Sequence, residues 1–207
     1  KYIAVPKYIL MDHRYHGGVT AQLDDKGGNA GWVARRWDPA VRARFHKLLF
    51  ALGKAFDGKI AGINLQETAI DLAVTGPHAA KDFTYAGYRD AIIANMDALK
   101  KAFKKSARIQ YANFMPGEWL PEDDKSYLRS IYQFAEKNGV GVGAPDLMPE
   151  KPGHKNHAYK FMQELRSGST IVGVAVQHGN YTGKTGVDIR PTGTWKNLVP
   201  ELLDFAR

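Results

Sequence analysis

The stretch KIAGINLQET, residues 59–68, decides the fold that we expect for this chain. Its apolar part, Ile60 to Leu65, is short and predicts a β-strand that is buried on both faces. Gln66, Glu67 and Thr68 follow immediately, so the strand ends in polar groups. In proteins built from parallel strands, ligands bind and reactions take place at the carboxyl ends of the strands. Glu67 is therefore a candidate for a functional carboxylate; a glutamate that only meets solvent in a loop is the alternative interpretation.

The composition predicts one folded domain that spans residues 1–207. Hydrophobic residues make up 44% of the 207 residues and aromatic residues 11%, which is enough for one sizeable core. The absence of cysteine excludes disulfides, a thiolate nucleophile and cysteine-based metal sites. No apolar run approaches the ~18 residues of a membrane-spanning helix, so we expect no membrane span.

The net charge of +8 favours acidic partners through long-range attraction. The basic residues are scattered, however, and the densest run, Lys100, Lys101, Lys104 and Lys105, falls at the end of an expected helix. Positive charges at that end complement the helix macrodipole, which explains the run without nucleic acid. We therefore expect no nucleic-acid partner, and an acidic polysaccharide stays open as a partner.

The rest of the chain repeats the pattern of a strand followed by a helix. Asp38 and Pro39 have the residue types preferred at a helix N-cap and first turn. Residues 17–37 are rich in glycine, show no period and predict a long loop. Nothing suggests antiparallel pairing. Strands are expected at 8–11, 60–65, 108–114, 140–144 and 170–176, and helices at 39–56, 85–105, from Pro121 to about 138, 158–166 and 195–206.

Five such units favour a parallel α/β fold, which can close as a barrel or stay open as a doubly wound sheet. All five expected strands end in polar, aromatic or acidic residues. A (β/α)8 (TIM) barrel brings every strand end to one rim, whereas an open sheet needs such residues only near its switch point. We expect the barrel, with the open doubly wound sheet as the alternative. Because five units cannot close a barrel, we expect an internal piece of a longer one, with about two strands before Tyr8 and about one after Arg207.

Two of these segments resemble a known family. The strand Gly62-Ile63-Asn64-Leu65-Gln66-Glu67, preceded by a helix that opens at Trp37-Asp38-Pro39, is similar to the middle of (β/α)8-barrel glycoside hydrolases of the large retaining clan. In that clan the fourth strand commonly ends in Asn-Glu, and the glutamate is the general acid/base. The resemblance implies that Glu67 is the proton donor, with Gln66 in place of the asparagine, and it implies no cofactor. The strands at 108–114, 140–144 and 170–176 would be the fifth, sixth and seventh.

The chain departs from the clan at the second catalytic residue. The clan's nucleophile is a glutamate at the end of the seventh strand, where this sequence has Gln177, and an amide cannot form the glycosyl-enzyme ester. The second carboxylate could come from another strand, with Asp146 as the first candidate and Glu118 as the second. It could also lie outside this sequence. A barrel that binds sugar without cleaving it also stays open. Glu67 and Asp146, two strands apart, suit the ~6.5–9.5 Å spacing of inverting enzymes better than the ~5 Å of retaining ones.

Other residues near the strand ends are candidates for binding the substrate, a polysaccharide or oligosaccharide that could be acidic. Amide side chains could hydrogen-bond hydroxyl groups, and aromatic rings could stack on sugar rings or belong to the core. A carbohydrate substrate favours a secreted or periplasmic protein. The binding candidates are Asp12, His13, Gln66, Asn113, Trp119, Gln177, His178 and Asn180, with Tyr111, Trp32 and Tyr181 as further stacking candidates.

A metal-dependent barrel hydrolase is the second class of function. A barrel could gather Asp12, His13, His16, Glu67, Asp146 and His178 around a divalent ion, although Asp-His pairs arise often by chance and the sequence has no HExxH helix. A non-catalytic carbohydrate-binding barrel is the third class. His154 and His157 lie in a lysine-rich stretch and are expected to be solvated.

Overall fold

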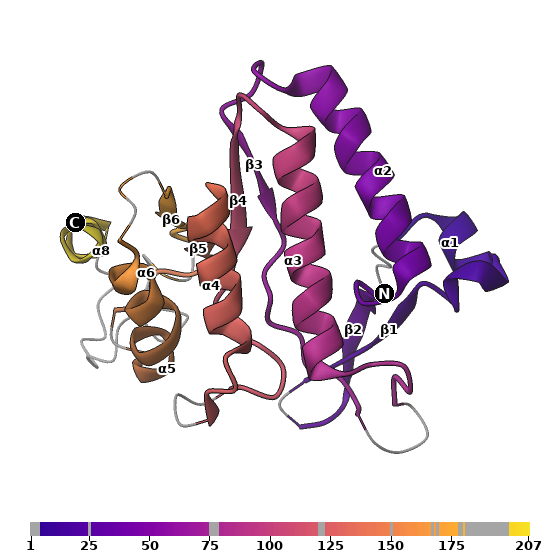
Figure 1. Cartoon of the computed structure of the whole chain (residues 1–207). Coiled ribbons are helices and arrows are strands. Elements are labelled where there is room, and N and C mark those ends of the chain that lie inside the picture. Colours follow the sequence, from indigo (N-terminus) through magenta and orange to yellow (C-terminus); the bar gives the residue numbers. More distant parts are fainter. Residues whose placement is uncertain are drawn as a thin grey trace. The chain divides into compact units, whose positions relative to one another are not determined.

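The computed structural model describes residues 5–24, 26–74, 79–119, 123–149, 151–166, 168, 170–177, 180 and 199–207. Within them the chain has an α/β fold with one parallel sheet and one antiparallel hairpin (Figure 1). The strands are β1 (Val19–Leu23), β2 (Asn29–Ala34), β3 (Gly62–Leu65), β4 (Ala107–Tyr111), β5 (Gly141–Ala144) and β6 (Val172–Val174). The helices are α1 (Lys7–Met11), η1 (His13–Tyr15), α2 (Pro39–Phe56), α3 (Tyr85–Ala102), α4 (Tyr127–Asn138), α5 (Pro152–His154), η3 (Lys155–Tyr159), α6 (Lys160–Glu164) and α8 (Val199–Ala206).

The parallel sheet has four strands in the order β3-β4-β5-β6. Ile109 of β4 pairs with Gly141 of β5, and Val142 of β5 pairs with Val172 of β6, both in parallel register. The α/β class predicted from the sequence is therefore confirmed. Among the described strands the sheet is open at β3 and at β6, and no closed barrel is seen.

The chain divides into two compact units, which are described separately. Unit 1 comprises Lys1–Ile63, Ala69–Arg108 and Met115–Gly117, and unit 2 comprises Asn64–Thr68, Ile109–Phe114 and Glu118–Arg207. Strands β3 and β4 contribute residues to both units.

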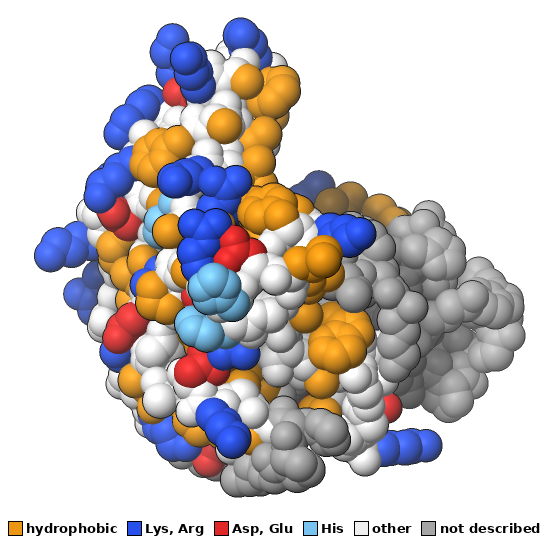
Figure 2. All heavy atoms as spheres, turned by 90° about the vertical axis from the view of Figure 1, so that its right-hand side faces the viewer, with side chains coloured by type: hydrophobic (Ala, Val, Ile, Leu, Met, Phe, Trp, Pro, Cys, Tyr) orange, Lys and Arg blue, Asp and Glu red, His pale blue; other side chains and the backbone are white. Residues whose placement is uncertain are grey.

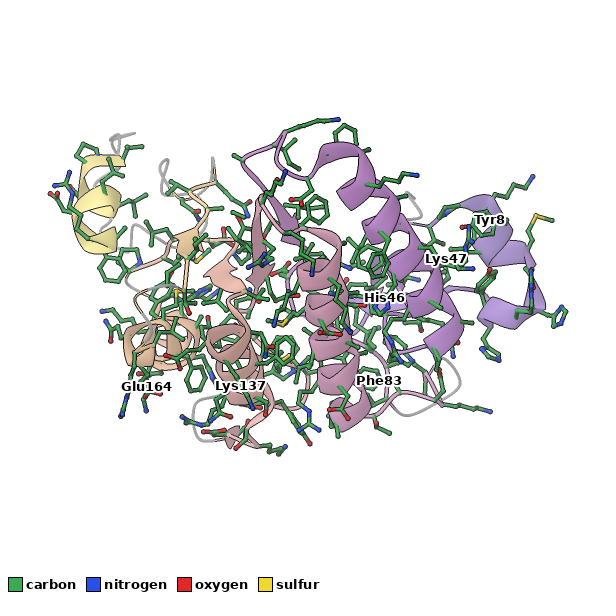
Figure 3. All side chains as sticks on the ribbon, turned by 45° about the horizontal axis from the view of Figure 1, so that its top comes forward. Tyr8, His46, Lys47, Phe83, Lys137 and Glu164 are labelled. Carbon is green, nitrogen blue, oxygen red and sulfur yellow. The ribbon has the colours of Figure 1, made fainter. Side chains whose placement is uncertain are left out.

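Unit 1 is built on the helices α2 and α3, and α2 begins at the cap that its sequence predicts. The Asp38 carboxylate accepts hydrogen bonds from the backbone N–H groups of Ala40 (2.8 Å) and Val41 (3.1 Å), and Pro39 occupies the first turn. The two helices pack against each other, and His46 of α2 (labelled in Figure 3) is bonded to Asn95 of α3 at 2.9 Å. Gly53 permits this packing, because a Cβ at that position would overlap the Ala102 carbonyl oxygen.

The strand predicted at 8–11 is wrong, because residues 7–11 form the helix α1. Pro6 stands at its N-cap with φ −59°, a value suited to a helix start. Ile9 is buried against Tyr15 and Val41, so the apolar run packs as a short helix. A run of four apolar residues has no period that could distinguish the two structures.

The long loop predicted at 17–37 is also wrong, because it contains the antiparallel hairpin β1–β2, with Val19 opposite Ala34. Asp24 closes the turn by accepting the N–H groups of Lys26 (2.9 Å) and Gly28 (2.8 Å). The hairpin also makes the expectation of no antiparallel pairing wrong.

Unit 2 carries β5 at its centre, with every residue from Gly141 to Ala144 buried. Helix α4 packs on β5 and ends at Asn138, where the next residue, Gly139, has a φ of 62° that suits a glycine C-cap. The expected helix 158–166 begins earlier, because α5, the π-helix η3 and α6 run continuously from Pro152 to Glu164.

Strand β3 differs from its prediction in length and burial. It begins at Gly62, and Ile60 before it is 38% exposed, while Asn64 is exposed and Leu65 buried. The prediction of a strand buried on both faces is therefore wrong. The reason is its position at an edge of the described sheet, where one side has no neighbouring strand in the part of the chain that is described.

Candidate functional site

Glu67 lies just after β3 and is held by a residue just after β4. The Asn113 side chain is 4% exposed, and its Nδ2 donates a hydrogen bond to Glu67 Oε2 (2.9 Å). Thr68 joins the two strand ends, because its N–H donates to the Tyr111 carbonyl (3.1 Å) and its hydroxyl donates to the Phe114 carbonyl (2.6 Å). The glutamate thus has a fixed amide neighbour. The sequence predicted that both residues follow strands, and they lie after β3 and β4.

A second carboxylate–asparagine pair lies beyond β5. The fully buried Asn180 donates from Nδ2 to Asp146 Oδ1 (3.0 Å). Its Oδ1 accepts the backbone N–H of Gln177 (2.7 Å) and, at 3.4 Å, that of Leu147. Asn180 therefore links the segment after β5 to the segment after β6 and orients the Asp146 carboxylate.

The π-helix also supports Asp146. Tyr159, its last residue, donates from its hydroxyl to the Asp146 carbonyl (3.0 Å) and accepts the Met148 N–H (2.7 Å). Burial raises the pKa of Tyr159, so the hydroxyl keeps the proton that it donates. π-helical turns occur often at functional sites, and this one fixes the backbone around the second carboxylate.

Glu118, the other candidate for the second carboxylate, has a structural contact instead. It is fully buried, and its Oε2 accepts the backbone N–H of Tyr127 (2.9 Å), the first residue of α4. The N-cap residue Ser126 makes no side-chain cap, so Glu118 caps the helix from a distance in sequence. Burial raises its pKa, and the helix N–H groups oppose that effect.

Gln66, Trp119 and Gln177 lie where a ligand could reach them, because all three are exposed. The Gln66 carbonyl accepts Gln110 Nε2 (2.8 Å), and Gln177 Nε2 donates to the Pro145 carbonyl (2.8 Å). The ring of Trp119, 38% exposed, lies 6.0 Å from that of Phe114. His178 and Tyr181 lie outside the described residues.

Asp12 and His13 belong to unit 1 and follow a helix rather than a strand, so the reason for predicting them fails. The Asp12 carboxylate binds Arg14, with Oδ1 at 3.0 Å from Nε, and this contact lowers the pKa of Asp12 to about 2. His13 is 97% exposed. In the same segment the buried Asp38 holds His16 Nδ1 at 2.7 Å.

His154 and His157 were expected to be solvated. That expectation is wrong, because both residues are only 2% exposed. Their rings lie 5.1 and 5.8 Å from Phe114. Their spacing of three residues, with helical residues on both sides, was the available signal for a shared face. Both therefore belong to the aromatic cluster beside the strand ends of unit 2.

His154 makes the stability of the protein depend on pH. Burial, and then the charge of Lys151, lower its pKa from 6.5 to about 4. The folded protein keeps His154 neutral while the unfolded chain takes up a proton below pH ~6.5, so the free energy of unfolding falls as the pH falls from 6.5 to 4. The loss is about 3 kcal/mol. Urea unfolding of His154→Leu across this window should lack this loss.

His13→Leu is the control, because it removes an exposed imidazole. Its unfolding free energy should keep the pH dependence of the unaltered protein. If the His154→Leu and unaltered proteins lose stability in parallel between pH 6.5 and 4, the buried neutral state of His154 is refuted.

Among the described residues, no three His, Asp or Glu side chains lie close enough together to hold a metal ion. Nor does any helix in the described part of the chain combine the length and apolarity needed to cross a membrane.

No protein family model matches the chain, no curated protein matches its sequence, and no solved structure matches its fold.

Proposed function

We propose that the protein is a glycoside hydrolase that acts on a polysaccharide or oligosaccharide, with Glu67 as proton donor and Asp146 as the second carboxylate. The observation that carries the proposal is the repeated arrangement at the strand ends. Each carboxylate follows a parallel strand and accepts a hydrogen bond from a buried asparagine, Asn113 for Glu67 and Asn180 for Asp146.

We also propose that the sheet is part of a (β/α)8 barrel. The order β3-β4-β5-β6 adds each strand on the same side of the last, without the reversal that defines a doubly wound sheet. Right-handed crossovers in one direction place their helices on one face, as a barrel requires. Apolar residues exposed near the open β6 edge, Ile171 at 48% and Val172 at 47%, are consistent with cover by a further strand.

Asp146 is preferred to Glu118 because its carboxylate has the freer environment. Glu118 is fully buried and caps α4, whereas Asp146 is partly exposed and its Oδ1 accepts a single side-chain bond from Asn180. β3 and β5 are separated by one strand, which gives a backbone distance of about 10 Å. That distance suits the ~6.5–9.5 Å between carboxyl groups of inverting enzymes, which leaves room for a water molecule.

The reaction would then run in one step. Glu67 gives a proton to the glycosidic oxygen as the bond to the anomeric carbon breaks. Asp146 removes a proton from the water that attacks that carbon from the opposite face. Trp119 offers an exposed ring on which a sugar could stack, beside Phe114.

A carbohydrate-binding barrel without catalysis is the second candidate, and Gln177 favours it. The residue after β6 is an amide where the clan has its nucleophile, and its side chain is bonded to the Pro145 carbonyl. This arrangement would suit a site that kept sugar recognition after losing the ester-forming carboxylate.

Two measurements on one panel of neutral and acidic polysaccharides separate these functions. Release of reducing ends reports cleavage, and retarded migration in gels that contain each polymer reports binding. We expect release, with inversion of the product anomer as read by NMR. Binding without release selects the second candidate, retention of the anomer excludes the proposed role of Asp146, and the absence of both signals refutes a carbohydrate function for this chain.

A further inference from the structure

The net positive charge of the protein resides in one of its two units. Unit 1 has 18 Lys and Arg residues and 9 Asp and Glu residues, whereas unit 2 has 11 and 12. Their formal charges are therefore +9 and −1, which account for the +8 of the whole chain. The proposed catalytic residues lie in unit 2, so the function proposed above leaves the charge of unit 1 unexplained.

Part of this charge gathers where α2 and α3 end. We call residues 54–60 and 101–105 the basic tip. It contains one acidic residue, Asp57, and five exposed lysines, which gives a formal charge of +4. Figure 2 shows Lys and Arg side chains at the uppermost end of this face, beside hydrophobic ones. The five lysines are Lys54, Lys59, Lys101, Lys104 and Lys105.

Asp57 gives the basic tip a fixed form. Its carboxylate accepts the backbone N–H groups of Lys104 (2.8 Å), Lys105 (2.9 Å) and Ser106 (2.9 Å). These hydrogen bonds, with that of Ser106 foremost, lower the pKa of Asp57 to about 2. Gly58 N–H donates to the Ser106 hydroxyl (2.8 Å), which adds a fourth hydrogen bond between the two loops. The Asp57 carboxylate thus binds backbone N–H groups and holds both lysine-bearing loops in place.

Apolar side chains project from the same surface. Phe56 is 45% exposed and Ile60 is 38% exposed. In the sequence Phe56 lies between Lys54 and Lys59, and Ile60 directly follows Lys59. Along α2, Leu48 and Phe50 are also exposed, at 52% and 46%. A soluble acidic polymer would use the lysines alone. An anionic bilayer uses both kinds of side chain, because lysines contact the headgroups while an aromatic ring enters the boundary with the acyl chains.

We propose that the basic tip docks the protein on an anionic lipid surface. The lysines supply attraction to the headgroups, and Phe56 and Ile60 enter the interface from a preformed pair of loops. This docking is peripheral, needs no membrane-spanning segment and does not depend on catalysis in unit 2.

The test is co-sedimentation with phosphatidylcholine vesicles that contain or lack phosphatidylglycerol. Binding is expected only with phosphatidylglycerol and should weaken as salt screens the charges. The variant with Lys54, Lys59 and Lys104 changed to Gln should bind roughly 100-fold less, because each lysine near such a surface contributes about five-fold. The matched control changes the exposed Lys7, Lys26 and Lys81 of unit 1 to Gln, which removes the same charge, and should lose less than about five-fold.

Phe56→Ser distinguishes a lipid surface from an acidic polymer. It should weaken binding to the phosphatidylglycerol vesicles and leave binding to dextran sulfate unchanged. Equal losses in the two lysine variants, binding that ignores phosphatidylglycerol, or an unchanged vesicle affinity of Phe56→Ser would each overturn the proposal. Thermal unfolding of every variant establishes that the comparison is made between folded proteins.

Discussion

Replacing Glu67 by glutamine is expected to lower kcat by about 10²–10⁴-fold on a substrate that the unaltered protein cleaves, the range that a positioned general acid contributes. The amide keeps the size of the side chain and can still accept the bond from Asn113 Nδ2, so the local structure should persist. It has no acidic proton to give to the glycosidic oxygen. The measurement is the rate of reducing-end release, with thermal unfolding of the variant as the check on folding.

The loss should also depend on the leaving group. An aryl glycoside with an acidic phenol needs little protonation, so Glu67→Gln should retain more activity on it than on a polysaccharide. A purely structural role would reduce both rates alike. Glu118→Gln is the matched control, because it changes a carboxylate that caps α4 and that the proposal does not use. A Glu67→Gln variant with more than about a tenth of the original rate would exclude Glu67 as the proton donor.

Gly143→Ala is expected to destabilise the protein by more than about 3 kcal/mol, or to prevent folding, because it forces a side chain into the centre of the sheet. Gly143 lies in the middle of β5, between Tyr111 and Gly173. A Cβ there would overlap the carbonyl oxygen of Gly173 and lie 3.2 Å from Tyr111 Cδ1. The carbonyl is backbone, so relief requires β5 and β6 to separate.

The residue that faces it provides the control. Gly173 is paired with Gly143, and a Cβ at Gly173 meets nothing within 4 Å. Gly173→Ala should change the free energy of unfolding by less than about 1 kcal/mol. Urea unfolding of the two variants measures the difference. Similar midpoints for both would show that the strands are not packed as closely as this register requires.

The helices α2 and α3 illustrate what could be predicted locally. Asp38 and Pro39 are adjacent in sequence, and the cap forms with N–H groups two and three residues away. The helical spacing of apolar residues after them extends over many positions, and so long a pattern seldom arises by chance. The strands β4 and β5 were also placed correctly to within a few residues, since each is a short segment bounded by turn or polar residues.

The site was predictable in part, because the sequence pattern shows which residues follow strands. That Glu67, Asn113 and Asp146 follow strands can be read along the chain. That Asn113 bonds Glu67 and Asn180 bonds Asp146 depends on neighbours 46 and 34 residues away. The structural contact of Glu118 was likewise hidden, because a serine at the N-cap suggests that the helix caps itself, whereas the Ser126 side chain makes no capping hydrogen bond.

The sequence by itself determined the parallel α/β class, the main helices with the N-cap of α2, and the carboxylates that follow β3 and β5, because these depend on short-range pattern and local hydrogen bonds. Only the tertiary structure decided that residues 7–11 form a helix, that 19–34 contain a hairpin, and that His154 and His157 are buried. Short apolar runs and isolated polar residues have nearly equal local free energies in several conformations. The contacts that choose among them come from distant parts of the chain, such as Val41 against Ile9 and Phe114 against His154.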